Sequence, residues 1–474
     1  MEHVALDPIA PLIGVVFTPR RLVRLGSALL LTVSARGLHA QGPPARDSLA
    51  RDSTAARVVL DSIAARLERA EAALALLRQQ LATESSTQVR LRSRVQLELS
   101  ARLIVNGWRT TGIASNSEVP TFAAVARPAD PRYGSTGLHT LGLSMRQSLV
   151  GASVSVDSVL GGVLVADVEL DFFSRALDPN PPLFPEPRLR TARAMLVWPR
   201  TEVMVGMETP LISDLTPITA AGVAIPTFTA AGNLWNWLPQ LRVTRELWRR
   251  GAVTPVSIAL QGAVMSPFSA DRHVTDAAGP DAGQLSGRPA LESRARLRWG
   301  IEEDVAGLQS VIQRGGEVGV GAHRGWLRAV GDTNLTSWAT SADGRVALGH
   351  GVEVRGEAYR GRLLRGLGGG AIGQNFGVLG DNVDKPGVPL TDVAGWVQIN
   401  AQWHPRVIAG VGCGTDRVLG ASADRRRNSV CAVHAMWRPA QPLLFSFELR
   451  DFKTRYAAGL QHARHLNIGF GIEL

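Results

Sequence analysis

From residue 88 onward, apolar and polar side chains alternate with a period of two along much of the chain. In residues 88–106, most odd-numbered positions from Val89 to Val105 are apolar, and mostly polar or charged residues stand between them. Odd and even side chains of a β-strand point to opposite faces, so one face of this segment is apolar and the other charged. The run exceeds an ordinary strand of about 5–6 residues and fits a tilted membrane strand of about 9–11 residues with an extension. The pattern therefore predicts a membrane-spanning strand.

The same alternation recurs in residues 162–173, 291–299, 443–450 and 465–474. A soluble β-sandwich would also alternate, but its outer faces rarely carry stacked like charges, whereas a water-filled interior tolerates them. A chain that ends inside such a strand is typical of a closed barrel, because closure pairs the last strand with the first and leaves no open edge.

The predicted fold class is therefore all-β, a transmembrane antiparallel β-barrel over residues 88–474. About 10 membrane residues per strand, with turns and loops, give about 16 strands within a range of about 14–18. A mean hydropathy of +0.04 and 45% hydrophobic residues agree with this fold, because only every second strand residue faces lipid. Tryptophans are expected to supply the girdle at the membrane interface, for example Trp198, Trp299, Trp403 and Trp437.

A heptad pattern in residues 55–84 predicts a short α-helical coiled coil in front of the barrel. Its apolar seam alternates steps of three and four residues and consists of Leu60, Ile63, Leu67, Ala70, Leu74, Leu77 and Leu81. Such a narrow stripe on a helix of about four turns is not stable alone. We expect it to self-associate as a homotrimer; two or four strands, or packing of the helix on its own barrel, are the alternatives.

Residues 1–40 have the features of an export signal. Basic residues between Arg20 and Arg24 precede the apolar run 25–35, which is too short to span a bilayer, and Ala40 offers a small residue for cleavage. Residues 41–54 form a polar linker. We therefore expect the barrel in the bacterial outer membrane, in contact with its lipids, and the coiled coil in the periplasm.

Composition and motifs point away from an enzyme. The formal net charge of +10 comes almost entirely from arginine, and two cysteines exclude a cysteine-rich metal site. No HExxH or GxSxG motif and no metal-ligand spacing occurs, and the glycine-rich stretch 366–373 lacks the phosphate-loop pattern and is predicted to be a flexible loop. We expect no catalysis, no cofactor and no metal. The arginine positions favour small anionic solutes over nucleic acid as partners.

Four segments carry a family resemblance. Residues 352–374 and 395–405 resemble a late strand, its loop and the following strand of one group of barrels, and residues 203–217 and 233–246 resemble a strand, the inward-folding region and the next strand. The group comprises bacterial outer-membrane porins related to the phosphate-selective and dicarboxylate-type trimeric porins. The coiled coil is shared with the dicarboxylate-type members. The resemblance spans most of residues 88–474.

This resemblance implies passive diffusion of small solutes through each barrel, narrowed by an inward-folded loop. The group's Gln-Thr-Trp-like stretch is replaced here by Met207, Glu208 and Thr209, so ligand specificity is not carried over. The segment Leu211–Asn233 is the candidate constriction loop. It is rich in Thr, Ala, Gly and Pro, and Asp214 is its only charged residue. An ordinary surface loop is the alternative for this segment.

The alternation also places charged side chains toward the barrel interior. A guanidinium stays ionised and offers a fork of donors to carboxylate or phosphate, and rings of arginine in a pore favour anions. Each candidate can alternatively be a solvated or salt-bridged interior residue. The basic candidates are Arg188, Arg190, Arg193, Arg242, Arg294, Arg296, Arg298 and Arg355, and the acidic candidates are Asp167, Glu169, Asp171 and Glu357.

The two cysteines flank a polar stretch, residues 415–428, that is predicted to be a loop. If this loop closes a hairpin, Cys413 and Cys431 lie opposite each other on one face. An oxidising periplasm permits a bridge, but two unbridged small residues facing lipid are the favoured prediction.

The sequence thus predicts an outer-membrane porin for passive diffusion of small hydrophilic solutes, with a weak preference for anions. The alternative is a structural barrel with a plugged lumen, tethered by the coiled coil.

Overall fold

The computed structural model describes residues 88–92, 95–126, 138–174, 184–250, 256–273, 279–300, 315–377, 382–420 and 422–474. The predicted signal peptide, linker and coiled coil lie outside these residues and stay predictions. The strands are β1 (Gln88–Arg92), β2 (Val95–Thr111), β3 (His139–Ser144), β4 (Leu149–Val159), β5 (Gly162–Asp171), β6 (Arg188–Val197), β7 (Thr201–Glu208), β8 (Leu238–Arg250), β9 (Val256–Met265), β10 (Ala290–Trp299), β11 (Gly316–Ala329), β12 (Thr333–Gly349), β13 (Val352–Arg362), β14 (Thr391–His404), β15 (Val407–Leu419), β16 (Arg425–Trp437), β17 (Leu443–Tyr456) and β18 (Gly459–Glu473). Short helices are α2 (Ala282–Leu285), η3 (Val330–Asp332), η4 (Arg365–Leu367) and α3 (Gly370–Gly373).

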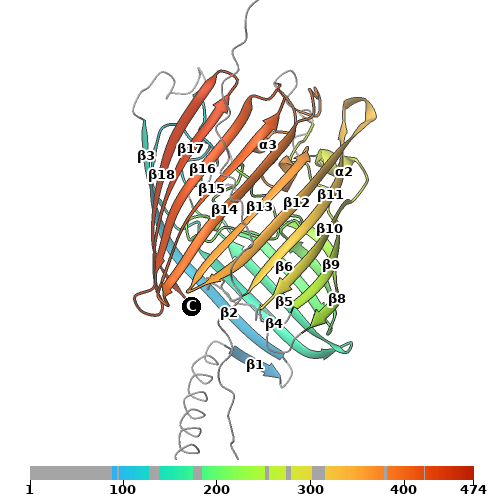
Figure 1. Ribbon diagram of the computed structural model, residues 1–474, viewed down its shortest axis with the longest axis vertical. Helices are drawn as coiled ribbons and strands as arrows, with labels where there is room; N and C mark the ends of the chain where they lie inside the picture. The colour runs from blue at the N-terminus through green and yellow to red at the C-terminus, as the bar shows by residue number, and fades with distance from the viewer. Residues whose placement is uncertain are drawn as a thin grey trace, which may run out of the picture. The chain divides into compact units, whose positions relative to one another are not determined.

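The strands close into a ring (Figure 1). β2 pairs with the last strand, β18, on one edge, and with β4 and then β3 on the other. β3 and β4 therefore share one position in the ring, while β1 pairs with β2 only beyond the end of β18. Within the described residues the closed antiparallel barrel thus has 16 strand positions. This confirms the all-β prediction and the expected strand number.

Residues 88–106 do not form the single long strand that the alternation predicted. β1 ends at Arg92, β2 begins at Val95, and the two pair antiparallel from Gln88 opposite Glu98. The polar extension therefore folds back on its own backbone. A hairpin here pairs N–H and C=O groups that a lone extension would leave as an open edge.

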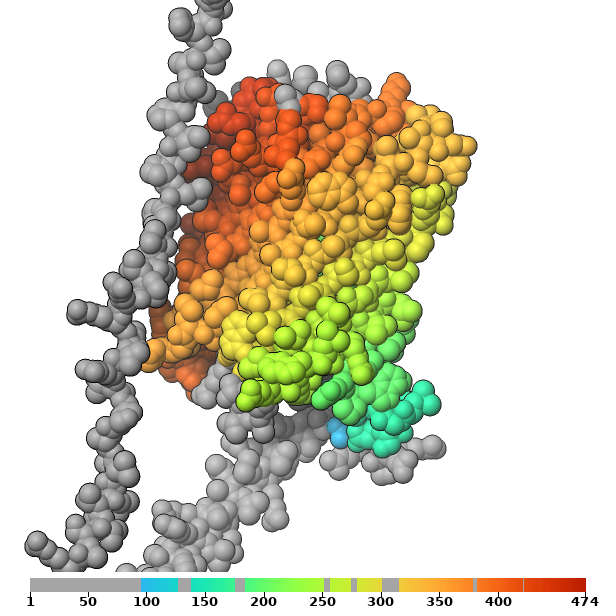
Figure 2. Space-filling view, turned by 45° about the vertical axis from the view of Figure 1, so that its right-hand side comes forward, coloured from blue at the N-terminus to red at the C-terminus, as the bar shows by residue number. Residues whose placement is uncertain are grey.

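The wall has an apolar outer face and a more polar inner face. In β2, Leu103 and Val105 are exposed, whereas Ile104 and Asn106 are fully buried. In β18, Ile468 and Phe470 are exposed on the outside, as the alternation predicted. Figure 2 shows the sequence colours running in order across the outer wall, as expected when most neighbouring strands are also neighbours in sequence. Among the described residues, no helix is long and apolar enough to cross a membrane.

The two ends of the barrel differ in their connections. The end that holds the C-terminus (Figure 1) carries mostly short turns, at residues 160–161, 198–200, 350–351, 405–406 and 438–442. The opposite end carries long connections, at residues 112–138, 172–187, 209–237, 266–289 and 363–390. Trp198, Trp299, Trp403 and Trp437 all lie at strand ends on the short-turn side, which is the arrangement expected of an interfacial aromatic girdle.

Two long connections fold into the barrel instead of projecting from it. Nearly all residues of the connection 209–237 are buried or half-buried, including Leu211, Phe228 and Leu234. The described part of the connection 363–390 contains η4 and α3 and is also largely buried. The glycine-rich stretch 366–373, predicted as a flexible loop, is therefore packed inside the molecule.

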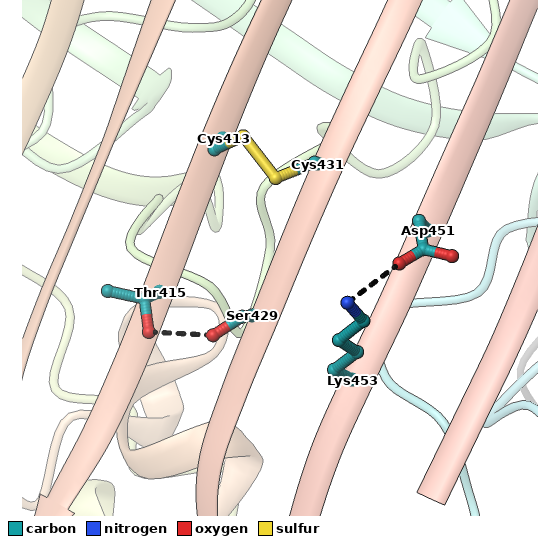
Figure 3. The surroundings of a disulfide bond; sticks show 6 residues. All are labelled: Cys413, Thr415, Ser429, Cys431, Asp451 and Lys453. Carbon is teal, nitrogen blue, oxygen red and sulfur yellow. Dashed lines mark hydrogen bonds and ion pairs between the residues drawn. A yellow bond between two sulfur atoms is a disulfide. The ribbon is translucent and has the colours of Figure 1, made fainter.

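The polar stretch 415–428 is mostly strand, contrary to the loop prediction. β15 continues to Leu419 and β16 begins at Arg425, because polar side chains here alternate on a wall that extends past its apolar band. Cys413 lies directly opposite Cys431, and the two form a disulfide on the outer face (Figure 3). The favoured prediction of two unbridged residues is therefore wrong, and the bridged alternative is the one observed.

Candidate pore constriction

The connection 209–237 is attached to the inner wall by three buried glutamates on different strands. Glu292 of β10 accepts a hydrogen bond from the Ile212 amide at 3.2 Å. Glu357 of β13 accepts from Ser213 Oγ at 2.8 Å, and also from the Leu234 amide at 3.2 Å. Because these carboxylates lie around the ring, the segment is held at several places instead of hanging from its two ends.

Glu448 of β17 supplies the third carboxylate attachment. It accepts hydrogen bonds from the hydroxyls of Thr219 and Thr227, the second at 3.1 Å. Its other partner is Arg450 on the same strand. The buried glutamates thus hold polar loop groups that would otherwise stay unpaired.

Amide side chains of the wall complete the attachment. Gln398 of β14 accepts from the Ile218 amide at 2.8 Å and donates to the Ile218 carbonyl at 3.0 Å. Asn428 of β16 donates to the Ala230 carbonyl at 2.9 Å, and Gln147 accepts from the Val223 amide at 3.1 Å. The segment therefore contacts opposite sides of the barrel interior.

The most accessible part of the segment centres on Thr216, which is exposed, with Asp214 and Leu215 half-buried before it. Asp214 lies 3.4 Å from Arg242 of β8 and 3.4 Å from Arg294 of β10. Burial raises the pKa of the Asp214 carboxyl, but the positive charges of Arg294 and Arg242 outweigh it, so the pKa lies below its ordinary value. Asp214 is therefore ionised at neutral pH.

Arg294 is the most buried arginine in this region, with only 1% of its surface exposed. Its Nε donates to Asp343 at 2.9 Å, and its other nitrogens reach Glu317 at 2.7 Å and Gln261 at 2.9 Å. Its guanidinium therefore pairs with Asp214 of the inward segment and with Glu317 and Asp343 of the barrel wall. A buried guanidinium with this many partners fixes the position of the loop more than it serves as a free charge.

Three neighbouring arginines are more accessible. Arg298 lies 3.0 Å from Glu317 with 27% of its side chain exposed. Arg355 pairs with Glu353 at 2.6 Å and donates to the Thr216 carbonyl at 3.0 Å. Arg296, between Arg294 and Arg298 along β10, is half-buried and pairs with no carboxylate among the described residues. These guanidinium groups lie beside the accessible part of the inward segment.

A second charged group lines β5 and β6. Arg188 pairs with Asp171 at 2.6 Å and donates to the Ala224 carbonyl at 2.9 Å, so it also holds the inward segment. Arg190 bonds to Glu169, and both Arg188 and Arg190 lie over the ring of Trp237. Cation–π contacts of this kind restrict the guanidinium planes.

Arg193 completes this second group. It lies 2.8 Å from Asp167 and also bonds to Glu208, with 33% of its side chain exposed. It is thus the most accessible of the three arginines of β6.

The structure sorts the predicted interior residues into two groups. One group surrounds Asp214 and comprises Arg242, Arg294, Arg296, Arg298 and Arg355. The other is the β5–β6 group, with Arg188, Arg190, Arg193, Asp167, Glu169 and Asp171. Glu357 belongs to neither, since its carboxylate is 6% exposed and holds the inward segment.

Sequence reasoning missed the other anchoring side chains. Glu292 and Glu448 stand on the polar faces of two alternating segments, so their inward direction was readable. The sequence pattern did not show which segment they hold, because their hydrogen-bonding partners Ile212 and Thr227 lie 80 and 221 positions away in the chain.

The second inward connection has its own acidic anchors. Asp392 of β14 accepts from the Ala371 amide at 2.7 Å, and Asp416 of β15 accepts from the Ile372 amide at 2.8 Å. Asp271, in the connection before β10, pairs with Arg365 at 2.7 Å. Burial raises the pKa of the Asp271 carboxyl, and the Arg365 charge offsets this only in part. Both inward segments are thus fastened by carboxylates that accept backbone or side-chain donors.

Among the described residues, no cluster of three or more His, Cys, Asp or Glu side chains is arranged to hold a metal ion. The arrangement is that of a closed barrel with a charged interior and an inward-folded segment across it.

Neither a protein-family model nor a curated protein sequence matches the chain. Among solved structures, the outer membrane channel DcaP of Acinetobacter baumannii is 13% identical with a TM-score of 0.54, over 81% of this chain and 99% of that chain. An anion-selective porin from Comamonas acidovorans is 10% identical with a TM-score of 0.48, over 80% of this chain and 100% of that chain. The first similarity concerns the fold alone: the closed antiparallel barrel of this chain resembles the fold of that solved structure.

Proposed function

We propose that the protein is an outer-membrane porin through which small hydrophilic solutes diffuse passively. The observation that carries this proposal is the inward segment 209–237, which is anchored across a closed barrel and leaves residues 214–216 accessible beside arginines of the wall. An apolar outer face suits lipid, and a charged inner face suits water and ions. The short turns would face the periplasm and the long connections the exterior.

We further propose a weak preference for anions. The acids near the accessible segment are mostly engaged: Asp343 and Glu317 hold Arg294, and Glu357 holds the segment itself. Arg296 pairs with no carboxylate among the residues that the structure describes, and Arg298 is partly exposed. Interior arginines of this kind favour anions in a pore.

Planar-bilayer recording tests both statements. The full-length protein is expected to conduct in defined steps, and reversal potentials in a salt gradient are expected to show anions crossing more readily than cations. Cation selectivity would contradict the charge preference while leaving the porin proposal intact.

A plugged structural barrel is the competing proposal, and the extensive burial of both inward segments is the observation in its favour. It predicts a correctly folded, heat-modifiable protein without measurable conductance. Assembly into a homotrimer through the seam in residues 55–84 belongs to the porin proposal and rests on the heptad pattern.

A further inference from the structure

A row of arginines crosses the outer wall of the barrel near its long-connection end. Cross-strand register places Arg360 opposite Val393, Val393 opposite Arg417, Arg417 opposite Arg427, and Arg427 opposite Arg455. Residues directly opposite each other in an antiparallel sheet point to the same face. The outer arginine row, Arg360, Arg417, Arg427 and Arg455, therefore spans five adjacent strands, β13 to β17.

All four side chains of the outer arginine row are exposed. None of them pairs with a carboxylate among the described residues, and the one hydrogen bond they make is from Arg427 to Thr415 at 3.5 Å. Like charges directly opposite one another destabilise a sheet. Two such pairs in succession, Arg417–Arg427 and Arg427–Arg455, would therefore be stabilised by negative charge from outside the chain.

More positive charge lies beside the row on β17 and β18. Lys453 and Arg464 have 62% and 66% of their side chains exposed, and His462 is also exposed. A single acid, Asp451, contacts all three, at 3.9, 3.0 and 2.6 Å. Figure 3 shows Asp451 and Lys453 on the strand next to Cys431. The basic surface thus continues to the closing strand.

The height of Arg427 on the barrel matches a bilayer boundary. Arg427 and Trp437 lie ten residues apart on β16, which is about 33 Å along a strand. With a strand tilt of about 40°, the separation along the barrel axis is roughly 25 Å, the height of the apolar band of a membrane barrel. Exposed apolar residues such as Val433 and Phe447 occupy the space between.

With Trp437 at one interface, Arg427 lies at the level of the lipid headgroups at the other, and the rest of the row lies within about 10 Å of that height because the strands are tilted. We infer that this surface binds phosphate-bearing lipid headgroups of the leaflet at the long-connection end. Arginine offers a forked set of donors that matches phosphate oxygens, and the repeated spacing of the row suits several phosphate groups at once. The inference rests on the outer-membrane placement proposed above, but not on conduction, because these side chains point away from the lumen.

Native mass spectrometry of the full-length protein in mild detergent, titrated with lipid A, tests the inference. A parallel titration with dephosphorylated lipid A shows whether binding depends on the phosphate groups. The variant R417Q/R427Q/R455Q removes three charges of the row. Each basic residue near an anionic lipid surface changes affinity by about fivefold, so the variant is expected to bind lipid A roughly 100-fold more weakly. The control R245Q/R250Q removes exposed arginines of β8 at the short-turn end and is expected to bind like the wild type.

Bilayer recording of the same proteins separates the two proposals. If the triple variant loses lipid A binding but conducts like the wild type, the inference is supported. If the triple variant loses lipid A binding and none of the proteins conducts, only the porin proposal is refuted. Equal binding of the phosphorylated and dephosphorylated lipid, or wild-type binding by the triple variant, would overturn the inference. If the triple variant dissociates from an oligomer but binds lipid A as the wild type does, the inference is also overturned, and the row is a contact between subunits. If the triple variant does not fold, R427Q alone is expected to show the fivefold loss.

Discussion

Arg294 shows how a charge inside a barrel can serve structure more than permeation. Its guanidinium is almost fully buried and is shared by Asp343, Glu317 and Asp214. Burying a charge is costly unless its partners are close and well oriented. Arg298, four residues along the same strand face, has one acidic partner and considerable exposure. Two arginines with the same sequence pattern thus have different roles.

The substitution Arg294→Met is expected to destabilise the barrel strongly, because it leaves Asp343 and Glu317 buried with less positive charge. Removing one partner of a buried ion pair costs about 3–5 kcal/mol. The matched control Arg298→Met is expected to cost at most about 1 kcal/mol, since its pair is partly exposed. Urea unfolding of the protein in lipid vesicles, followed by tryptophan fluorescence, measures both. Equal losses in the two variants would contradict the assignment of Arg294 as the structural charge.

Asp214 gives the constriction a pH dependence of known sign. Its folded-state pKa lies below the ordinary value of about 3.9, so its stabilising pairs with Arg242 and Arg294 are complete above that value. They are lost only as the pH falls through the lower folded-state pKa. Anion preference in the wild type is therefore expected to stay constant from neutral pH down to about 5, well above this range.

The variant Asp214→Asn is expected to prefer anions more strongly than the wild type at neutral pH, because a negative charge is removed next to Arg296 and Arg298. A partly exposed charge changes interaction energies by about 0.2–1 kcal/mol, so the anion-to-cation permeability ratio is expected to rise about 1.4- to 5-fold. Reversal potentials at several pH values measure it. A variant that matches the wild type throughout would show that Asp214 lies off the solute path.

At the scale of elements, the inward segment 209–237 depends on side chains supplied by the strands around it. Glu357 alone accepts hydrogen bonds from Ser213, Asn233 and Leu234. The first of these residues lies near the start of the segment and the other two near its end. One carboxylate therefore joins both arms of the segment to the same place on β13.

The substitution Glu357→Ala is expected to release both arms and leave the barrel closed, because strand pairing does not use this side chain. Each buried polar group left without its partner costs about 1–3 kcal/mol, so the segment loses enough to move. Single-channel recording is expected to show larger or noisier conductance. The control Glu473→Gln weakens pairs with Arg102 and Arg438 at the short-turn rim and is expected to leave conductance unchanged. Wild-type conductance in the Glu357 variant would mean that the segment does not limit the pore.

The same elements show what the sequence could and could not predict. Residues 291–299 were identified as a wall strand because lipid outside and charge inside impose a period of two. The inward direction of Glu292 followed from that period. Its contact with Ile212, 80 residues away, did not follow, since local pattern carries no information on which loop enters the barrel. The family resemblance, not periodicity, pointed to residues 211–233.

The loop prediction for residues 415–428 was wrong for a related reason. The polar composition of this stretch predicts a loop, but strands of this barrel continue beyond the apolar band and carry Arg417 and Arg427 on their outer face. Alternation alone does not mark where lipid ends. The disulfide between Cys413 and Cys431 likewise required the register of β15 and β16, which a one-residue shift would have destroyed.

At the scale of the whole molecule, one closed barrel accounts for residues 95–474, and the seam in residues 55–84 remains to be explained. A narrow leucine stripe needs partner helices, whereas the barrel needs none to satisfy its strand edges. The two parts therefore predict different responses to substitution. Disrupting the seam is expected to change the oligomeric state and leave permeation through each barrel unaltered.

The double substitution Leu67→Asp and Leu74→Asp tests this separation. Each aspartate would place a charge in a packed apolar seam, at a cost of several kcal/mol, repeated in every copy of the helix. We expect native mass spectrometry to show a trimer for the wild type and single barrels for the variant, with the conductance of each barrel retained. The control Arg69→Asp and Arg78→Asp introduces the same side chains at outer positions of the heptad, where water solvates them, and is expected to leave the trimer intact. A variant that remains trimeric would assign assembly to the barrel wall, and loss of conductance together with the trimer would mean that the barrels depend on one another.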